Sequence, residues 1–364
     1  MMNINEPENY EDGYYHISKD FLEYPDAVIY IIWSRRGPGK TYSALRYPYG
    51  KFKTLYIKRT NIDVKTICEY TGSEEFDPSP WKPLNRDFGL NVKPKLIKDG
   101  IGAFLNSDES GNPSGEVVNY LCSLNAIKTI KGMDLTEAEW IIFDEFIPQP
   151  GEVVRQSEGK MLLNLYETVN RDRRKRGRPG LKLILLANAE EISTPVTNTL
   201  EVTDTIAEMQ MKGIHKFYDA NRGIFFHHIS QEEVPLVEME LRDMYRVMKG
   251  TAWGDMAYGG EFANNDFSNV VDMSIKGMKC MLGIKYRRNH FAYVYFHPEK
   301  GMFYMTDIKG KPSRMFDLDR ENEQKKFWID YGYMLKQKCI NDQMKFKKYS
   351  LYDLIVNYHE FYKI

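Results

Sequence analysis

Short apolar runs alternate with amphipathic stretches over the first half of the chain. Four short runs have the composition of buried strands: 27–34, which is rich in β-branched residues, and 53–60, 139–146 and 181–190. Residues 41–47 begin like a helix that Pro48 ends, and 161–170 is also helical in pattern. Buried strands separated by helices are typical of a mainly parallel sheet covered on both faces. The pattern therefore predicts an α/β nucleotide-binding architecture.

The pattern changes after residue 200. Residues 230–250 are amphipathic with helical spacing, and the glycine-rich stretch 259–266 (GGEFANND) follows them. We therefore expect 201–265 to form a helical lid or linker that follows a first α/β domain in 1–200.

Strand patterns return near the C-terminus. Residues 280–286, 290–297 and 301–308 predict three antiparallel strands joined by short turns, and 321–364 predicts helices with basic and aromatic side chains. We expect 266–364 to form a small C-terminal α+β domain.

Composition narrows the function classes. The hydrophobic content of 42% is enough for a buried core, and a net charge of −1 excludes a globally basic nucleic-acid coat. The four cysteines are too far apart for a metal knuckle or a Cys-x-x-Cys pair. No apolar run approaches the roughly 20 residues of a membrane span, and the polar, acidic N-terminus is unlike a secretory signal. We expect an intracellular soluble protein with no membrane contact.

The sequence SRRGPGKT (34–41) ends like a phosphate-binding loop. It lies between a predicted strand and a predicted helix, the context in which backbone N–H groups and a lysine bind phosphates. A serine stands where the motif has its first glycine, so a glycine–proline turn that merely precedes Lys-Thr is the alternative. The candidate nucleotide-binding residues are Ser34, Gly37, Gly39, Lys40, Thr41 and Tyr42.

A second motif matches the first. The apolar strand WIIFDEF ends in Asp144 and Glu145, where α/β sheets bind ligands. Asp144 and Thr41 are candidates to hold Mg²⁺, and Glu145 to orient or deprotonate the attacking water. Asn188 ends the next predicted strand and is placed to contact the γ-phosphate or that water. A surface turn and a strand-end cap are the alternatives, and the adjacent glutamate favours hydrolysis over a kinase.

A basic run, NRDRRKRGRPGLK (170–182), lies between these two strands. It is compatible with a solvated face, with nucleic-acid backbone contact, or with an arginine finger that reaches a neighbouring subunit's ATP. Arg171 is the first candidate for the finger, with Arg173 and Arg174 as alternatives.

Together these stretches resemble the phi29-type DNA-packaging ATPases of tailed phages, terminase-like P-loop ATPases of the ASCE class. The resemblance rests on four segments: 34–43, 131–146, 185–191 and 245–266. It implies a bacteriophage motor that binds ATP and Mg²⁺ and forms a homomeric ring, usually a pentamer. The ring would hydrolyse ATP to move double-stranded DNA into a preformed capsid. It would act in the host cytoplasm, transiently at the portal vertex, and be absent from the mature virion.

The resemblance also gives Arg35 and Arg36 a role, because related enzymes carry an arginine inside the phosphate loop near the γ-phosphate. It further implies a C-terminal domain like an RNase H-type nuclease that has lost its activity. Lys285 stands near the position of a metal-binding aspartate on its first strand, and an ammonium cannot ligate Mg²⁺. This domain would dock on the portal or connector, in some relatives through a structural RNA.

Lys58, Arg59, Lys128 and Lys131 are candidates for DNA contact in the pore of the ring, with ordinary surface positions as the alternative. Two other functions stay open at this point. One is a large-terminase-like ATPase with an active nuclease, and the other is a nucleotide-switched scaffold without turnover.

Overall fold

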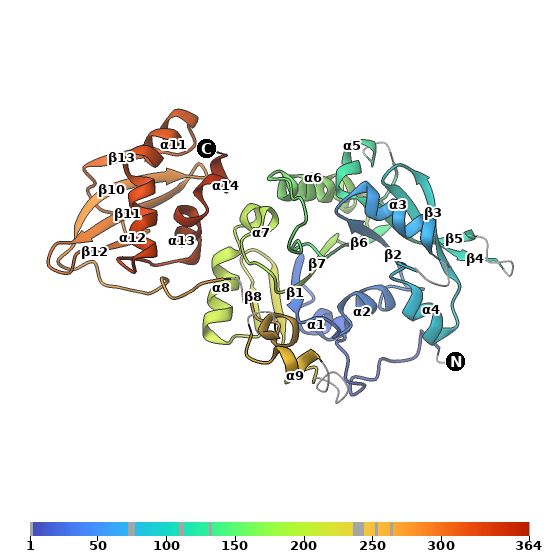
Figure 1. Cartoon of the computed structure of the whole chain (residues 1–364). Helices are drawn as coiled ribbons and strands as arrows, with labels where there is room; N and C mark the ends of the chain where they lie inside the picture. Colours follow the sequence, from blue (N-terminus) through green and yellow to red (C-terminus); the bar gives the residue numbers. More distant parts are fainter. Residues whose placement is uncertain are drawn as a thin grey trace. The chain divides into compact units, whose positions relative to one another are not determined.

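The computed structural model describes residues 3–71, 77–108, 113–130, 133–235, 244–251, 254–262 and 265–363. The chain divides into two compact units, Met1–Leu200 with Lys212–Asn264, and Glu201–Met211 with Asn265–Ile364. Each unit has its own sheet and its own buried core. Figure 1 shows the elements of both.

The first unit is built on a nine-stranded sheet in the order β3-β4-β5-β2-β6-β7-β1-β9-β8. The middle strands β5-β2-β6-β7-β1-β9 run parallel to one another. Toward the edges, β4 pairs antiparallel with β5 and β3, and β8 pairs antiparallel with β9. The strands are Ile29–Ser34 (β1), Lys53–Lys58 (β2), Val92–Lys98 (β3), Ile101–Ser107 (β4), Pro113–Ser123 (β5), Ala138–Asp144 (β6), Lys182–Asn188 (β7), Lys216–Asp219 (β8) and Ile224–Ile229 (β9).

Helices connect these strands. They are Ile17–Glu23 (α1), Lys40–Arg46 (α2), Asn61–Tyr70 (α3), Lys82–Phe88 (α4), Ile127–Ile130 (α5), Glu158–Asn170 (α6), Pro195–Leu200 (α7) and Met244–Met248 (α9). The start of α3 shows how local sequence sets an element: Thr60 and Asp63 form a reciprocal capping box. In β1, residues 30–33 are buried, as expected for a strand covered on both faces.

The four predicted strands are confirmed as β1, β2, β6 and β7, and the two predicted helices as α2 and α6. The large, mainly parallel sheet in a mixed α/β fold is therefore as predicted. The lid prediction was wrong over 216–229, because β8 and β9 belong to the sheet, and every residue of β9 is buried. Of the helix expected over 230–250, residues 236–243 lie outside the described residues. Residues 231–234 form a turn instead of a helix, and Met244–Met248 (α9) is helical as expected.

The second unit has a five-stranded sheet in the order β13-β10-β11-β12-β14. The strands β10, β11 and β12 form the predicted antiparallel meander, and β13 pairs parallel with β10. The strands are Lys279–Tyr286 (β10), His290–His297 (β11), Met302–Thr306 (β12), Arg314–Asp317 (β13) and Met344–Phe346 (β14), and the helices are Thr203–Lys212 (α8), Glu321–Phe327 (α11), Tyr333–Ile340 (α12), Tyr349–Val356 (α13) and Tyr358–Tyr362 (α14).

Candidate nucleotide-binding site

A sharp loop joins β1 to α2. The strand ends at Ser34, and the helix begins at Lys40. Gly37 and Gly39 have φ angles of 97° and 94°, in the left-handed region that residues with a Cβ rarely adopt. The loop therefore depends on both glycines to turn back immediately before Lys40.

Lys40 lies beneath this loop with its side chain buried. Its Nζ donates to Ser34 Oγ at 2.5 Å, to the Arg35 carbonyl oxygen at 3.0 Å and to Asn188 Oδ1 at 3.2 Å. The pairing of β1 with β7 places Ser34 directly beside Asn188. Burial lowers the pKa of Lys40 to about 7, although the negative charge of Asp144 opposes that shift.

Asp144 ends β6, and two hydroxyls hold its carboxylate. Thr41 Oγ1 donates to Oδ1 at 2.9 Å, and the Tyr56 hydroxyl donates to Oδ2 at 2.6 Å. Tyr56 belongs to β2, the neighbour of β6 in the sheet. Carboxylate and hydroxyl oxygens are the hard ligands that Mg²⁺ prefers, and protein sites for it use one or two such groups with phosphates and water. Thr41 and Asp144 therefore fit a magnesium ion by their chemistry.

Glu145 follows in a left-handed conformation with φ 57°. Its Oε2 accepts from Lys58 Nζ at 3.0 Å, and its Oε1 accepts from Gln149 Nε2 at 3.2 Å. Burial raises the pKa of Glu145, but the charges of Lys58, Arg59 and Arg36 outweigh it, so the pKa is lower than usual. In this arrangement the carboxylate is ionised, and Lys58 holds it.

The two loop arginines point to different places. Arg36 lines the cavity, where its Nη2 donates to Gln149 Oε1 at 3.1 Å. Arg35 is buried, and its Nη2 donates to the carbonyl oxygens of Val234 and Pro235 at 3.4 and 3.3 Å. Only Arg36 therefore faces the cavity, while Arg35 joins the loop to the segment that follows β9.

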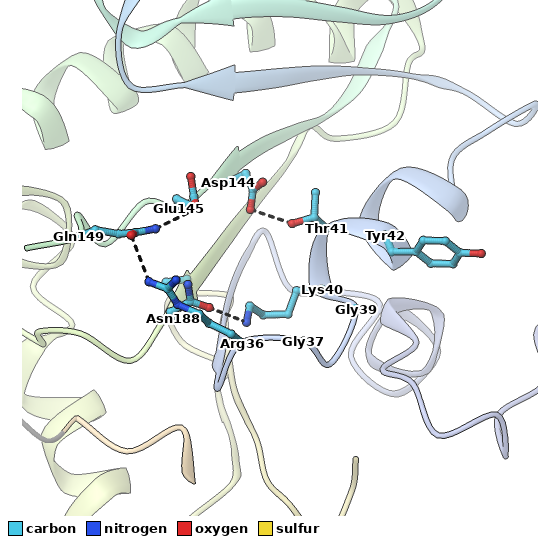
Figure 2. A pocket seen from close by; sticks show the side chains of 11 residues that line it. Arg36, Gly37, Gly39, Lys40, Thr41, Tyr42, Asp144, Glu145, Gln149 and Asn188 are labelled. Atoms are coloured by element: carbon cyan, nitrogen blue, oxygen red, sulfur yellow. Dashed lines mark hydrogen bonds between the residues drawn. The ribbon is translucent and has the colours of Figure 1, made fainter. Parts of the chain in front are cut away.

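These side chains surround one open cavity of about 360 Å³. In Figure 2, Thr41 and Asp144 point toward each other, Lys40 points toward Asn188, and the Tyr42 ring points away. The lining residues are Arg36, Gly37, Gly39, Lys40, Thr41, Tyr42, Asp144, Glu145, Gln149, Ala187 and Asn188. Ser34 is not among them and contacts Lys40 instead. The structure thus brings nearly all of the predicted nucleotide-site residues together.

Sequence reasoning missed Tyr56 and Gln149. Gln149 bridges Glu145 and Arg36, but no motif marks a glutamine four residues after the acidic pair. Tyr56 also belongs to no motif, and its hydroxyl reaches Asp144 because β2 pairs with β6, a strand order that the sequence does not specify.

Two of the residues predicted to contact DNA lie beside Glu145, at the end of β6. Lys58 pairs with Glu145, and its side chain is only 18% exposed. Arg59 is buried and hydrogen-bonds to Glu158 and to the backbone after β6. Both side chains turn toward acidic groups brought close by the pairing of β2 with β6, so DNA contact through them stays a prediction that these ion pairs disfavour. The Lys128 side chain and Lys131 lie outside the described residues.

The basic run after α6 is divided between buried and exposed arginines. Arg173 is 1% exposed and donates to the carbonyl oxygens of Thr136 and Ala138, so it cannot serve as a finger. Arg171 and Arg174 are exposed. Because Arg173 contacts the start of β6, the run lies at the strand end opposite Asp144, roughly 20 Å away at about 3.3 Å per residue. Arg171 therefore lies far from the cavity of its own chain.

Comparison with solved structures identifies the fold. One neighbour is "The Phi-28 gp11 DNA packaging Motor", with a TM-score of 0.59 and 18% identity, covering 97% of this chain and 99% of that one. Another is "The bacteriophage Phi-29 viral genome packaging motor assembly", with a TM-score of 0.58 and 17% identity, covering 95% and 98%. The chain has the fold of these packaging motor proteins. The likeness extends over both units.

No protein-family model matches the sequence, and no curated protein matches it significantly. Among the described residues, no helix has both the length and the apolar character that crossing a membrane would require.

Proposed function

We propose that the chain is an ATP hydrolase whose turnover drives double-stranded DNA into a preformed phage capsid. The observation that carries this proposal is a single cavity that combines Lys40, the Thr41–Asp144 pair and Glu145. The fold likeness to packaging motors over nearly the whole chain supports it. We assign hydrolysis to the first unit, and docking on the portal to the second.

Each residue at the cavity is assigned a separate role in ATP binding or hydrolysis. Lys40 would bind the β- and γ-phosphates, and Asn188 would contact the γ-phosphate or the attacking water. Thr41 and Asp144 would hold Mg²⁺, which when bound neutralises phosphate charge. Glu145 would orient the water and accept its proton once Lys58 releases the carboxylate. That release raises the pKa of Glu145, because it removes the nearest positive charge, and so makes the carboxylate a better base.

Arg36 is the loop arginine that we assign to the γ-phosphate. It lines the cavity, and it contacts Gln149, which also contacts Glu145. A phosphate that attracts Arg36 would therefore pull on the hydrogen bonds that hold Glu145. Arg35 would pass the state of the loop to the segment after β9, through the Val234 and Pro235 carbonyls.

The partners follow from the same proposal. The chain would assemble as a homomeric ring, expected to be a pentamer, at the portal vertex in the host cytoplasm. Its net charge of −1 fits a local, sequence-blind grip on DNA phosphates better than tight general binding. A structural RNA between ring and portal is a further candidate partner.

The alternative with an active nuclease is disfavoured by the second unit. Lys285 is the second-last residue of β10 and pairs with Asp317, and its Nζ lies 3.2 Å from Asp317 and 3.6 Å from Asp319. An ammonium therefore already neutralises these carboxylates at the position where a nuclease would need a metal.

ATP turnover and DNA stimulation test the proposed function. We expect Mg²⁺-dependent phosphate release by the purified protein that rises when portal-bearing empty capsids and double-stranded DNA are added, and protection of that DNA from added nuclease. Absence of turnover under these conditions, with ATP still bound, would instead support the nucleotide-switched scaffold. Cutting of plasmid DNA with Mn²⁺ would support the live nuclease.

Nucleotide affinity should depend on pH through Lys40. Its pKa is about 7 in the free protein, and a bound phosphate favours the ammonium, so binding raises that pKa. Affinity for ADP should therefore fall as pH rises from about 7 to about 9, by up to about tenfold per unit. Calorimetry in two buffers of different protonation enthalpy would count the protons taken up. Lys40→Arg, charged throughout, should lose the dependence, and a flat profile in the unmodified protein would contradict the assignment.

A further inference from the structure

Arg59 lies directly after β2 and spans the space between that strand and the chain that leaves β6. Its side chain is 8% exposed. The Nη2 atom donates to the carbonyl oxygens of Glu145 and Phe146, both at 3.0 Å. One buried guanidinium thus binds two consecutive carbonyls at the candidate water-activating residue.

The backbone at Glu145 needs such support. Its φ of 57° is unfavourable for a residue with a Cβ and persists only where neighbours impose it. On one side, the Phe146 N–H donates to the Leu186 carbonyl at 3.1 Å, which returns the chain to β7. On the other side, Arg59 holds the carbonyl oxygens of Glu145 and Phe146 through its Nη2 atom. Glu145, at this left-handed turn, is among the residues that line the cavity, and Figure 2 shows its side chain beside Gln149.

Two glutamates hold the Arg59 side chain in place. Its Nε donates to Glu158 Oε1 at 2.9 Å, and its Nη1 pairs with Glu152. Glu158 is 3% exposed and begins α6, so the guanidinium is anchored on an element that does not line the cavity. The forked, planar guanidinium can make all of these bonds at once, whereas the ammonium of a lysine has fewer donors and a different geometry.

We infer that Arg59 is the positioning residue of Glu145: it holds the backbone of 145–146 so that the carboxylate enters the cavity. Lys58 bonds the Glu145 carboxylate, while Arg59 bonds its backbone, so two adjacent residues after β2 control different parts of one side chain. Arg59 acts through the backbone of Glu145 and does not itself line the cavity. The inference rests on the proposed ATP hydrolysis.

Arg59→Lys tests the inference, because it keeps a positive charge for Glu158 and Glu152 but loses the fork. We expect kcat for ATP to fall about 10- to 100-fold, the effect of a small misplacement of a catalytic group, with ADP affinity unchanged within about twofold. Arg86→Lys is the matched control, since Arg86 is 75% exposed and pairs with Asp87 outside the cavity. It should leave both values unchanged.

A double variant separates positioning from general stability. In a Glu145→Gln background, Arg59→Lys should cause no further loss in single-turnover hydrolysis, because its effect passes through the removed carboxylate. Additive losses, or an unchanged kcat in Arg59→Lys, would overturn the inference. If Arg59→Lys does not fold, Glu152→Gln replaces it, with a smaller loss of kcat and the same non-additivity; an unchanged kcat there also overturns it. Absence of turnover in the unmodified protein would reject the proposed function itself.

Discussion

Glu145→Gln should abolish ATP turnover while leaving ATP binding intact. The amide cannot accept a proton from water, and loss of a general base lowers the rate by about 10²- to 10⁴-fold. Its oxygen can still accept from Lys58, so the turn after β6 should survive. Phosphate release measures the loss, and displacement of a fluorescent nucleotide measures the retained binding.

Two further variants serve as controls for Glu145→Gln. Lys40→Ala should lose nucleotide binding, because it removes the ammonium beneath the loop. Glu69→Gln changes an exposed glutamate on α3 that pairs with Lys65 on the same helix, and it should behave as the unmodified protein. If Glu145→Gln hydrolyses ATP at the normal rate, another group must activate the water.

The parts of the fold that sequence predicted are those that a local pattern specifies. β1, the glycine loop and α2 follow one another directly in the sequence, and an acidic pair marks the end of β6. β3 has three lysines and a proline among seven residues, so no apolar run marked it. β9 is apolar but lies in a stretch whose surroundings suggested helices. Local patterning therefore predicted the centre of the sheet better than its edges.

The site divides along a similar line. The residues proposed to bind phosphate and metal could be predicted from the sequence, because each belongs to a short motif. The side chains that contact β2 and Arg59 after it could not be predicted, because the partners of Arg59 lie 93 and 99 residues further along the chain. A basic pair at a strand end reads as a surface feature until the strand order shows that acidic groups face it. For this reason the ion pairs of Lys58 and Arg59 could not be predicted from the sequence.

Arg171→Ala should reduce turnover in the assembled ring by about 10³-fold or more, the usual effect of removing an arginine finger. Arg171 is exposed beyond the end of α6, at the opposite end of β6 from its own cavity. It can therefore reach only the ATP of a neighbouring copy. Turnover of the unmodified protein should rise cooperatively with protein concentration, because a monomer lacks the finger.

Mixing variants distinguishes a finger in trans from a structural arginine. Arg171→Ala has an intact cavity, and Lys40→Ala has an intact Arg171, so mixed rings should recover part of the activity that each lacks alone. Arg176→Ala, exposed in the same run, is the control and should be active by itself. If Arg174→Ala rather than Arg171→Ala shows the loss and the rescue, the finger is Arg174. Turnover that rises only linearly with protein concentration, without rescue on mixing, would leave each subunit hydrolysing ATP alone.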